Sequence, residues 1–339
     1  MTTPRPPATI FDPVLITRTP LRASLGGGGT DLPSYYSRFG ATVIAAAINK
    51  YIYVGINRTF TPNYFLKYSE LELVESPSEI RHPLIREAFV AHDLEPGVEL
   101  VSLADIPDGT GLGSSGTFTV GVLKAIYAFR RLHVSTSALA EEACDIEMNR
   151  LGRAVGKQDQ YIAAMGGLIC LEFSRGGEVT ASPLRISTAT LHDLDEHLLL
   201  FFTGYSRRSV TILEDQQKRS EAGDTAMLEN LHAIGRIGIR VKAALEAGDT
   251  QGFGRLLDEH WRIKRARTTG ISTSDIDRWY EAGMASGALG GKLVGAGAGG
   301  FLMFYSRHPQ ELRQAMAAVG LMELRFNFDH DGSTVIVRD

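Results

Sequence analysis

The chain has 339 residues, which is long for one small domain and suits two packed lobes with a substantial core. Its hydrophobic fraction of 44% and charged fraction of 22% are ordinary for a globular protein, and a net charge of −4 argues against nucleic acid or an acidic membrane as the main partner. Cys144 and Cys170 are the only cysteines, which excludes a disulfide framework, and the nine histidines show no metal-ligand spacing. Without a bilayer-length apolar run or a signal-peptide pattern, the sequence predicts a cytoplasmic enzyme or binding protein.

A run of four glycines follows the first predicted strand, which spans residues 14–19 after a Pro- and Thr-rich lead-in. Gly26–Gly29 let the backbone approach a ligand closely, Arg22 places a cation before the run, and Thr30 and Asp31 place polar groups after it. A flexible loop with a solvated Asp31 would also contain glycines. The combination of a cation, a glycine run and an acid favours a ligand site instead.

Residues 41–56 are apolar and β-branched, with Asn49 and Lys50 in the middle, and predict two strands or one hairpin. Tyr51 and Tyr53 alternate along this stretch and could line an adenine pocket, although ordinary packing within a sheet explains them better. A short helix is predicted over residues 82–92 and a strand over residues 98–106.

The segment from Pro107 to Gly116 holds four glycines and two serines between that strand and a stretch of helical spacing. Glycines allow positive φ, and the following helix offers free N–H groups and its positive dipole end, so the segment predicts a phosphate-binding loop. Gly111–Gly116 and Gly295–Gly300 also match the dinucleotide-binding fingerprint. No acid-terminated second strand follows about 20 residues on, and the Walker pattern is absent, so we expect a phosphate loop of a third kind.

Two carboxylates follow this loop. A helix is predicted over residues 135–150, with Glu147 at the edge of its apolar stripe. A carboxylate in that position is usually a solvated flank and becomes interesting only if it faces a metal. Asp159 looks like the start of a short helix, where an N-cap role is the simplest interpretation. A strand over residues 168–173 closes the first half.

The second half is predicted to contain a buried strand over residues 198–202 and long helices over 209–221, 226–247, 251–267 and 274–286. A second glycine-rich segment, Gly290–Gly300, leads into a strand over 301–305, and a helix over 310–319 and strands over 324–328 and 334–337 follow. Strands and helices do not alternate simply, so the predicted fold class is α+β.

Three glycine-rich segments in this order resemble the motifs of the GHMP small-molecule kinases: Pro20-x-Arg22 with Gly26–Asp31, then Pro107–Gly116, then Gly295–Gly300. The resemblance spans nearly the whole chain. It implies a two-lobed fold, with a ribosomal S5 domain 2-like ATP-binding lobe over residues 14–182 and a ferredoxin-like lobe over residues 183–339. It also implies ATP and Mg²⁺ as cofactors.

The family resemblance implies roles for individual residues. Ser115 and Glu147 would hold Mg²⁺, Asp159 would be the general base or orienting carboxylate for the acceptor hydroxyl, and Arg22 would keep Asp159 ionised and stabilise developing charge. The ATP phosphates would be held by Pro107, Gly109, Gly111, Leu112, Gly113, Ser114, Ser115 and Gly116. The substrate would be bound by Gly28, Gly29, Thr30, Asp31, Arg262, Lys264 and Gly297.

Within the family, four stretches are similar to the subgroup that phosphorylates D-glycero-D-manno-heptose 7-phosphate: Thr19–Arg22 with the Gly-Gly-Gly-Thr-Asp run, Gln158–Tyr161, Trp261–Lys264 and Gly295–Gly300. The implied reaction is phosphorylation of the anomeric C1 hydroxyl to give a 1,7-bisphosphate. The distal phosphate of such a substrate needs cations, and the candidates are Arg262, Lys264, Arg265, Arg267, Arg207 and Arg208. A solvated helix face is the alternative for this basic run.

Other acceptors remain as hypotheses. Galactokinases carry Glu-His where this chain has Gly28 and Gly29, which argues against galactose. Another sugar 1-kinase, for L-fucose or a related hexose, or a cyclitol kinase is the second hypothesis. A non-catalytic ATP and sugar sensor is the third, and the intact Asp159, Glu147 and phosphate loop weigh against it. The expected partner is a small-molecule sugar phosphate, and the oligomeric state is open, with a homodimer as one alternative.

Overall fold

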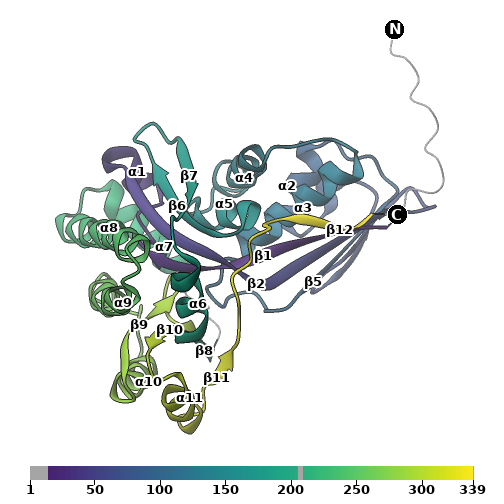
Figure 1. Ribbon diagram of the computed structural model, residues 1–339. Helices are drawn as coiled ribbons and strands as arrows, with labels where there is room; N and C mark the ends of the chain where they lie inside the picture. Colours follow the sequence, from purple (N-terminus) through teal and green to yellow (C-terminus); the bar gives the residue numbers. More distant parts are fainter. Residues whose placement is uncertain (1–13, 205–208, 339) are drawn as a thin grey trace.

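Two β-sheets organise the chain in the computed structural model, which describes residues 14–204 and 209–338 (Figure 1). Among these residues the larger sheet has eight strands, in the order β12-β1-β2-β5-β3-β4, with β6 and then β7 branching from β2. Its strands are β1 (Leu15–Gly26), β2 (Ala41–Arg58), β3 (Tyr64–Lys67), β4 (Leu71–Val74), β5 (Val98–Ala104), β6 (Leu168–Phe173), β7 (Val179–Pro183) and β12 (Thr334–Arg338).

Strand β2 is one continuous strand, so the predicted pair of strands or hairpin over residues 41–56 is wrong. Its first part pairs with β6 and its second part with β5, while β1 pairs along both parts. Pro20 lies opposite Tyr51 and Leu21 opposite Ile48, so the two residues between Ile48 and Tyr51 form a bulge. A bulge bends a strand without ending it, and the backbone groups that a hairpin would satisfy are satisfied here by three neighbouring strands.

Helices cover one face of this sheet. They are α1 (Pro33–Phe39), α2 (Pro83–Ala91), α3 (Ser114–Phe129), α4 (Thr136–Asp145) and α5 (Gln158–Met165), with a 3-10 turn at Pro77–Glu79 and a π-helical turn at Ile146–Arg150 that continues α4. The buried side of α3 includes Val120, Leu123 and Ile126, which belong to the same core as the strands beneath. The phosphate loop and both candidate carboxylates therefore lie on elements that pack against one another.

The smaller sheet contains β8 (Leu198–Gly204), β9 (Ala288–Val294), β10 (Gly300–Ser306) and β11 (Met322–Leu324), all antiparallel in the order β11-β8-β10-β9. Its helices are α6 (Thr188–His197), α7 (Ser209–Glu221), α8 (Thr225–Glu246), α9 (Thr250–Arg265), α10 (Ser274–Ala285) and α11 (Pro309–Ala318). The strand order and the helices between β8 and β9 and between β10 and β11 give the ferredoxin-like arrangement that the resemblance implies.

The two lobes share elements at their junction. Helix α8 packs so tightly on the glycine run that a Cβ on Gly26 would lie 3.0 Å from the Cβ of Val241. At the end of the chain, β12 returns to pair with β1 in the larger sheet, as Figure 1 shows. The proposed division into residues 14–182 and 183–339 thus places one strand of the first lobe in the second segment.

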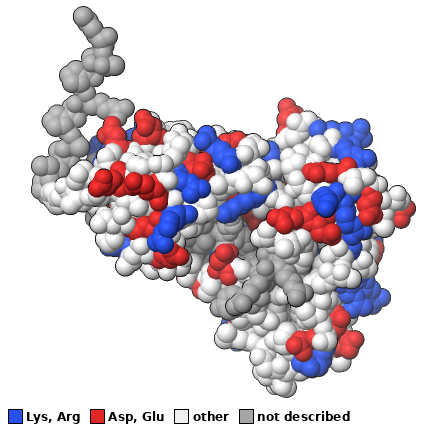
Figure 2. All heavy atoms as spheres, turned by 180° about the vertical axis from the view of Figure 1, so that it is seen from behind, with Lys and Arg blue, Asp and Glu red and all other residues white. Residues whose placement is uncertain are grey.

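Acidic and basic side chains are interspersed over the face drawn in Figure 2, and neither sign forms an extended area there. No helix within residues 14–204 and 209–338 is both long enough and apolar enough to cross a membrane. The cytoplasmic location stays a prediction.

Candidate active site

The predicted phosphate loop connects β5 to α3 and depends on glycine conformations. Gly109, Gly111 and Gly113 have φ values of 77°, 79° and 82°, which residues with a Cβ rarely adopt, and Gly113 is the N-cap of α3. Within the loop, Leu112 is fully buried and its carbonyl accepts the backbone N–H of Arg22 at 3.0 Å. The carbonyl of Pro107 accepts the hydroxyl of Thr110 at 3.2 Å. The loop is therefore held in one shape before any ligand arrives.

The third glycine-rich segment, Gly295–Gly300, packs against this loop. A Cβ on Gly111 would lie 2.6 Å from the carbonyl oxygen of Val294, and a Cβ on Gly295 would lie 2.5 Å from Cα of Gly111. The two backbones can approach this closely only because neither residue has a side chain. Gly297, a predicted substrate contact, lines neither of the two cavities described below, and a Cβ there would lie 3.0 Å from Cα of Ile271.

A cavity of about 310 Å³ opens beside the start of α3. Ser114, Ser115 and Arg153 line one part of it, and Tyr68 and His82, whose rings meet edge to face at 4.8 Å, line another. Its position at the phosphate loop makes it the candidate nucleotide cavity. Tyr51 and Tyr53 are not among its lining residues; Tyr51 instead lies under Arg18 and donates its hydroxyl to Asp329 at 3.0 Å.

Ser115 and Glu147, the predicted magnesium ligands, lie together. The Ser115 hydroxyl donates to Oε2 of Glu147 at 2.5 Å, and Gln160 donates to Oε1 at 2.8 Å. Glu147 is fully buried on the π-helical turn, and burial raises the pKa of its carboxyl, an effect that the hydrogen bonds from Ser115 and Gln160 oppose. The alternative prediction, that Glu147 lies on a solvated side of its helix, is wrong.

The donor chemistry of this pair fits Mg²⁺. Magnesium takes oxygen ligands and is commonly held by one or two protein groups together with substrate phosphates and water. Arg153 supports the same conclusion, because its guanidinium lies 3.0 Å from Oγ of Ser115 and 3.5 Å from Oε2 of Glu147. A cation is therefore already stabilised by these two oxygens. Arg153 was not predicted from the sequence, because its contact with Ser115 and Glu147 depends on how the turn after Glu147 folds back.

Arg22 and Asp159, the predicted catalytic pair, form a bidentate ion pair. Nε of Arg22 lies 2.7 Å from Oδ1 of Asp159, and its NH2 lies 3.0 Å from Oδ2. The third nitrogen of Arg22 donates to the carbonyl of Gly111 at 2.5 Å. Asp159 lies in the first turn of α5, whose N-cap is Lys157, so the carboxylate is free of capping and the N-cap interpretation is wrong. The pair sits directly against Gly113, where a Cβ would lie 3.2 Å from Cγ of Asp159.

A second cavity, of about 110 Å³, is lined by this ion pair, which does not line the first cavity. Arg22, Asp159, Asp31, Gly28 and Gly29 all line it, as predicted for a substrate site. The carboxylate of Asp31 is 4% exposed and accepts the backbone N–H of Gly29 at 2.9 Å. Burial and the charge of Asp159 raise its pKa. We call this space the acceptor cavity.

Thr30, also predicted to bind the substrate, does not line the acceptor cavity. Its side chain is fully buried and donates to the carbonyl of Gly27 at 2.7 Å. Thr30 therefore stabilises the turn of the glycine run.

The basic residues of the second half separate into two groups. Lys264 and Arg267 line the acceptor cavity and are 6% and 8% exposed. Arg262 corrects the prediction: its side chain is 70% exposed and pairs with Asp258 one helical turn away. Arg265 likewise pairs with Asp277 on the surface. Arg207 and Arg208 lie outside the described residues.

Two further basic side chains at the cavity were not predicted. Lys292 on β9 is 2% exposed and lies 3.2 Å from Nδ1 of His260 on α9, which is also buried. Burial lowers the pKa of both groups well below the usual range, and nearby cations add to the effect. Within α9, His260 is one turn before Lys264, so helical spacing offered a signal for it. Lys292 gave only the unusual sign of a lysine inside a buried strand.

Three residues that line the acceptor cavity each have a buried polar atom without a hydrogen-bond partner within the described part of the chain: Oγ of Ser24, Oε1 of Gln158 and NH2 of Arg267. Most buried polar groups in proteins are paired, and leaving one unpaired costs roughly 1–3 kcal/mol. Unpaired donors and acceptors gathered in one cavity indicate a polar ligand.

The phosphate loop, the two cavities and the Arg22–Asp159 ion pair against Gly113 are features that define the class of protein, a small-molecule phosphotransferase. The family model for the GHMP kinases N terminal domain matches residues 81–167, and the model for the GHMP kinases C terminal matches residues 241–320. The chain belongs to the GHMP kinase family, and ATP is therefore its phosphoryl donor. The predicted family and the α+β two-lobed fold are confirmed.

Individual relatives extend the comparison. The chain is 32% identical over 303 residues to the D-glycero-alpha-D-manno-heptose 7-phosphate kinase of Campylobacter jejuni, covering 85% of this chain and 88% of that protein. It is 25% identical to the L-fucokinase/L-fucose-1-P guanylyltransferase of Bacteroides fragilis, covering 88% of this chain and 35% of that protein. The crystal structure of a D-glycero-D-manno-heptose 1-phosphate kinase from Bacteroides thetaiotaomicron is similar with a TM-score of 0.78 at 26% identity, covering 96% of this chain and 99% of that one.

Proposed function

We propose that this protein transfers the γ-phosphoryl group of ATP to the C1 hydroxyl of D-glycero-D-manno-heptose 7-phosphate, giving the 1,7-bisphosphate. The observation that carries the proposal is the Arg22–Asp159 ion pair, which lines a cavity rich in cations and lies against Gly113 in the predicted phosphate loop. The names of the Campylobacter and Bacteroides thetaiotaomicron relatives support a heptose phosphate as the acceptor.

Phosphoryl transfer requires alignment of the acceptor oxygen and neutralisation of charge. Asp159 accepts the proton of the anomeric hydroxyl, which is more acidic than an ordinary alcohol. Arg22 contacts both oxygens of Asp159 and so fixes the direction of its free lone pairs toward the acceptor cavity. The same guanidinium bonds the carbonyl of Gly111, which ties the base to the loop that holds the ATP phosphates.

Ser115 and Glu147 would hold Mg²⁺, which when bound supplies charge neutralisation at the ATP phosphates. The N–H groups at the start of α3 would bind the same phosphates, where the positive end of the helix dipole also favours negative charge. In the acceptor cavity, Asp31 accepts hydrogen bonds from sugar hydroxyls, and Ser24 and Gln158 offer their unpaired oxygens to the same hydroxyls.

An L-fucose 1-kinase is the second candidate, because the Bacteroides fragilis relative carries that activity in its name. Fucose is uncharged, so it has no anionic group to pair with Lys264, Arg267 and Lys292, which line the cavity. A buried, unpaired cation costs several kcal/mol, so a cavity for a neutral sugar would be expected to lack this cluster.

A panel of acceptors tests the proposal directly. ADP release is measured with heptose 7-phosphate, unphosphorylated heptose, L-fucose and galactose at saturating Mg-ATP. We expect kcat/KM to be highest for heptose 7-phosphate by at least a factor of about 100, the value of one to two charge-assisted hydrogen bonds. Faster turnover of fucose or galactose would refute the assignment.

A further inference from the structure

The acceptor cavity is lined by more basic than acidic side chains. Four arginine and lysine side chains line it against two carboxylates, Asp31 and Asp159. Asp159 is paired with Arg22, so the excess belongs to the remaining arginine and lysine groups, which are Lys264, Arg267 and Lys292. Burial lowers the pKa of the two lysines and so disfavours their charged forms in the free enzyme. An anionic ligand such as a phosphate monoester would favour their protonated forms and pair with Arg267, so the lining points to an anionic ligand.

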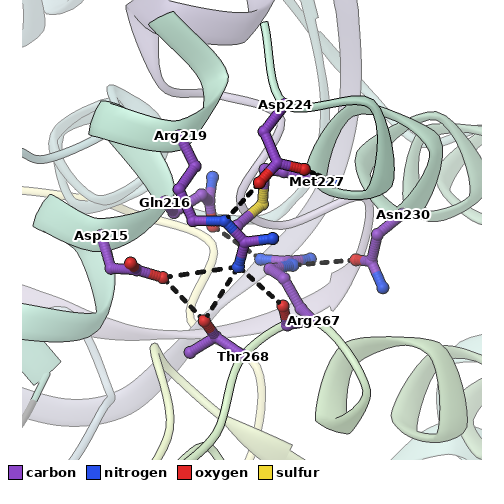
Figure 3. Close-up of polar contacts among 8 residues, drawn as sticks. All are labelled: Asp215, Gln216, Arg219, Asp224, Met227, Asn230, Arg267 and Thr268. Atoms are coloured by element: carbon purple, nitrogen blue, oxygen red, sulfur yellow. Dashed lines mark hydrogen bonds and ion pairs between the residues drawn. The ribbon is translucent and has the colours of Figure 1, made fainter. Parts of the chain in front are cut away.

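Arg267 is held in one orientation by side chains from two neighbouring helices. It follows the end of α9, and Figure 3 shows its guanidinium lying between Gln216 of α7 and Asn230 of α8. Its Nε donates to Oδ1 of Asn230 at 2.9 Å, and its NH1 donates to Oε1 of Gln216 at 2.6 Å. The terminal NH2, with two N–H groups, has no partner within the described residues.

The backbone of Arg267 is held as firmly as its side chain. NH1 of Arg219 donates to the carbonyl of Arg267 at 3.3 Å and to the hydroxyl of Thr268 at 3.2 Å, as Figure 3 shows. Arg219 is itself paired with Asp224 at 2.8 Å. This bracing orders several side chains at an entropic cost, and it fixes the guanidinium of a residue that lines the acceptor cavity.

The glycine run leaves space for this guanidinium. A Cβ on Gly29 would lie 2.8 Å from NH1 of Arg267, and the carbonyl of Gly29 accepts Nε2 of Gln216 at 2.7 Å. Gly28 and Gly29 occupy the positions where galactokinases carry Glu-His, according to the family resemblance. In this chain the missing side chains give an arginine access to the cavity, so the glycines and Arg267 act together.

Arg267 also lies away from the reacting end of the cavity. Arg22 and Asp159 contact the phosphate loop at Gly111 and Gly113, whereas Arg267 contacts residues of α7 and α8. Lys264 lines the same cavity and is buried. These separate contacts match an acceptor whose reacting hydroxyl and fixed phosphate are at opposite ends.

We propose that Arg267, oriented by Gln216 and Asn230 and admitted by Gly29, binds the phosphate that the acceptor already carries, and thereby selects phosphorylated over free sugars. Lys264, which lines the same cavity, assists. Arginine suits this task because its planar fork binds phosphate oxygens bidentately. The inference rests on the proposed function for the identity of the sugar, but the anion site itself does not depend on which sugar binds.

The test compares two variants with two substrates. Arg267→Gln is expected to lower kcat/KM for heptose 7-phosphate by a factor of about 100, mainly through KM, the effect of losing one or two charge-assisted hydrogen bonds. Its kcat/KM for unphosphorylated heptose should change by less than about threefold, because this substrate lacks the phosphate that Arg267 would contact. Arg262→Gln, on the exposed face of α9, is the matched control and should leave both substrates unchanged. Equal losses for both substrates with Arg267→Gln would overturn the proposal.

A rescue experiment separates phosphate binding from a structural role. Inorganic phosphite added with unphosphorylated heptose should activate the wild-type enzyme and not Arg267→Gln. Asn230→Ala keeps the guanidinium and removes one brace, so it should weaken discrimination between the two substrates by an intermediate amount. If Arg267→Gln unfolds, Asn230→Ala and Arg267→Lys carry the comparison, and unchanged discrimination in both would refute the assignment.

Failure of the proposed function can be distinguished from failure of the anion site. Binding of inorganic phosphate is measured by calorimetry with the nucleotide cavity filled by a non-hydrolysable ATP analogue and Mg²⁺. Binding to the wild type that is lost in Arg267→Gln supports the site even if heptose 7-phosphate is not turned over. Equal binding to both proteins, or none to the wild type, overturns it.

Discussion

Raising the pH from about 6.5 to about 9 is expected to weaken binding of the sugar phosphate through the titration of Lys264. Its ammonium is buried, donates to the carbonyl of Leu293 at 2.9 Å and to that of Gly295, and retains a third N–H. Burial, then the charges of Arg267 and Arg22, lower its pKa from 10.5 to about 7. In the free enzyme the proton is therefore lost as the pH rises through neutrality.

The size of the effect follows from linkage. A phosphate dianion prefers the protonated lysine, so its binding raises the pKa of Lys264 in the complex. One charge-assisted hydrogen bond contributes roughly 1.5–3 kcal/mol, and one pKa unit corresponds to about 1.4 kcal/mol. The shift on binding is thus roughly one to two units. The dissociation constant should rise by a factor of about 10 to 100 as the pH climbs above about 7, and then level off.

The assay is KM for heptose 7-phosphate as a function of pH at saturating Mg-ATP, with calorimetry near neutral pH in two buffers to detect proton uptake on binding. Lys264→Met keeps the length of the side chain and removes the proton, so its profile should be flat. Arg267, whose pKa is lowered by burial to about 10, stays charged throughout. A flat wild-type profile would refute the reasoning, and a steep profile in Lys264→Met would transfer the titration to Lys292 or His260, the other basic groups that face Lys264.

Three further predictions concern the reacting end of the site. Asp159→Asn should lower kcat by a factor of about 10² to 10⁴ while the dissociation constant for ATP, measured by equilibrium binding, stays within about twofold; undiminished turnover would remove Asp159 as the base. Glu147→Gln should raise the Mg²⁺ concentration needed for half-maximal activity. It should not lower the melting temperature at pH 7. Burial raises the pKa of Glu147, so the folded state loses stability as the pH rises through that raised value, and glutamine removes the ionisation that causes the loss. A marked drop in melting temperature would contradict this. Gly111→Ala should destabilise the fold by about 2–4 kcal/mol in urea unfolding, since its Cβ would press on the carbonyl of Val294 at a φ of 79°. Gly152→Ala, at a φ of 63° with no neighbour within 4 Å, is its control at about 1–2 kcal/mol, and equal losses would show that crowding contributes nothing.

The phosphate loop depends on the backbone conformation of neighbouring residues and could be predicted from the sequence alone. Positive φ at Gly109, Gly111 and Gly113 is required by a turn that spans few residues, and glycine is the residue that supplies it. The order of three glycine-rich segments carried the family. The boundaries of the long helices also followed from periodicity, as for α9, which ends within two residues of the predicted limit.

The acceptor cavity, in contrast, is assembled from residues that are distant in the sequence. Arg262 and Lys264 are two residues apart on α9, yet one is solvated and the other is buried, because the packing of α9 against β9 decides which helical face meets the cavity. Lys292 reaches that cavity from β9, and the turn after Glu147 brings Arg153 to Ser115, one of the two proposed magnesium ligands. Residue types and spacing therefore predicted the phosphate loop, and the order of the glycine-rich segments predicted the family and, with it, ATP and the role proposed for Asp159. Burial, which depends on how the lobes pack, decided which of the candidate cations line the acceptor cavity, where we propose that a second phosphate binds.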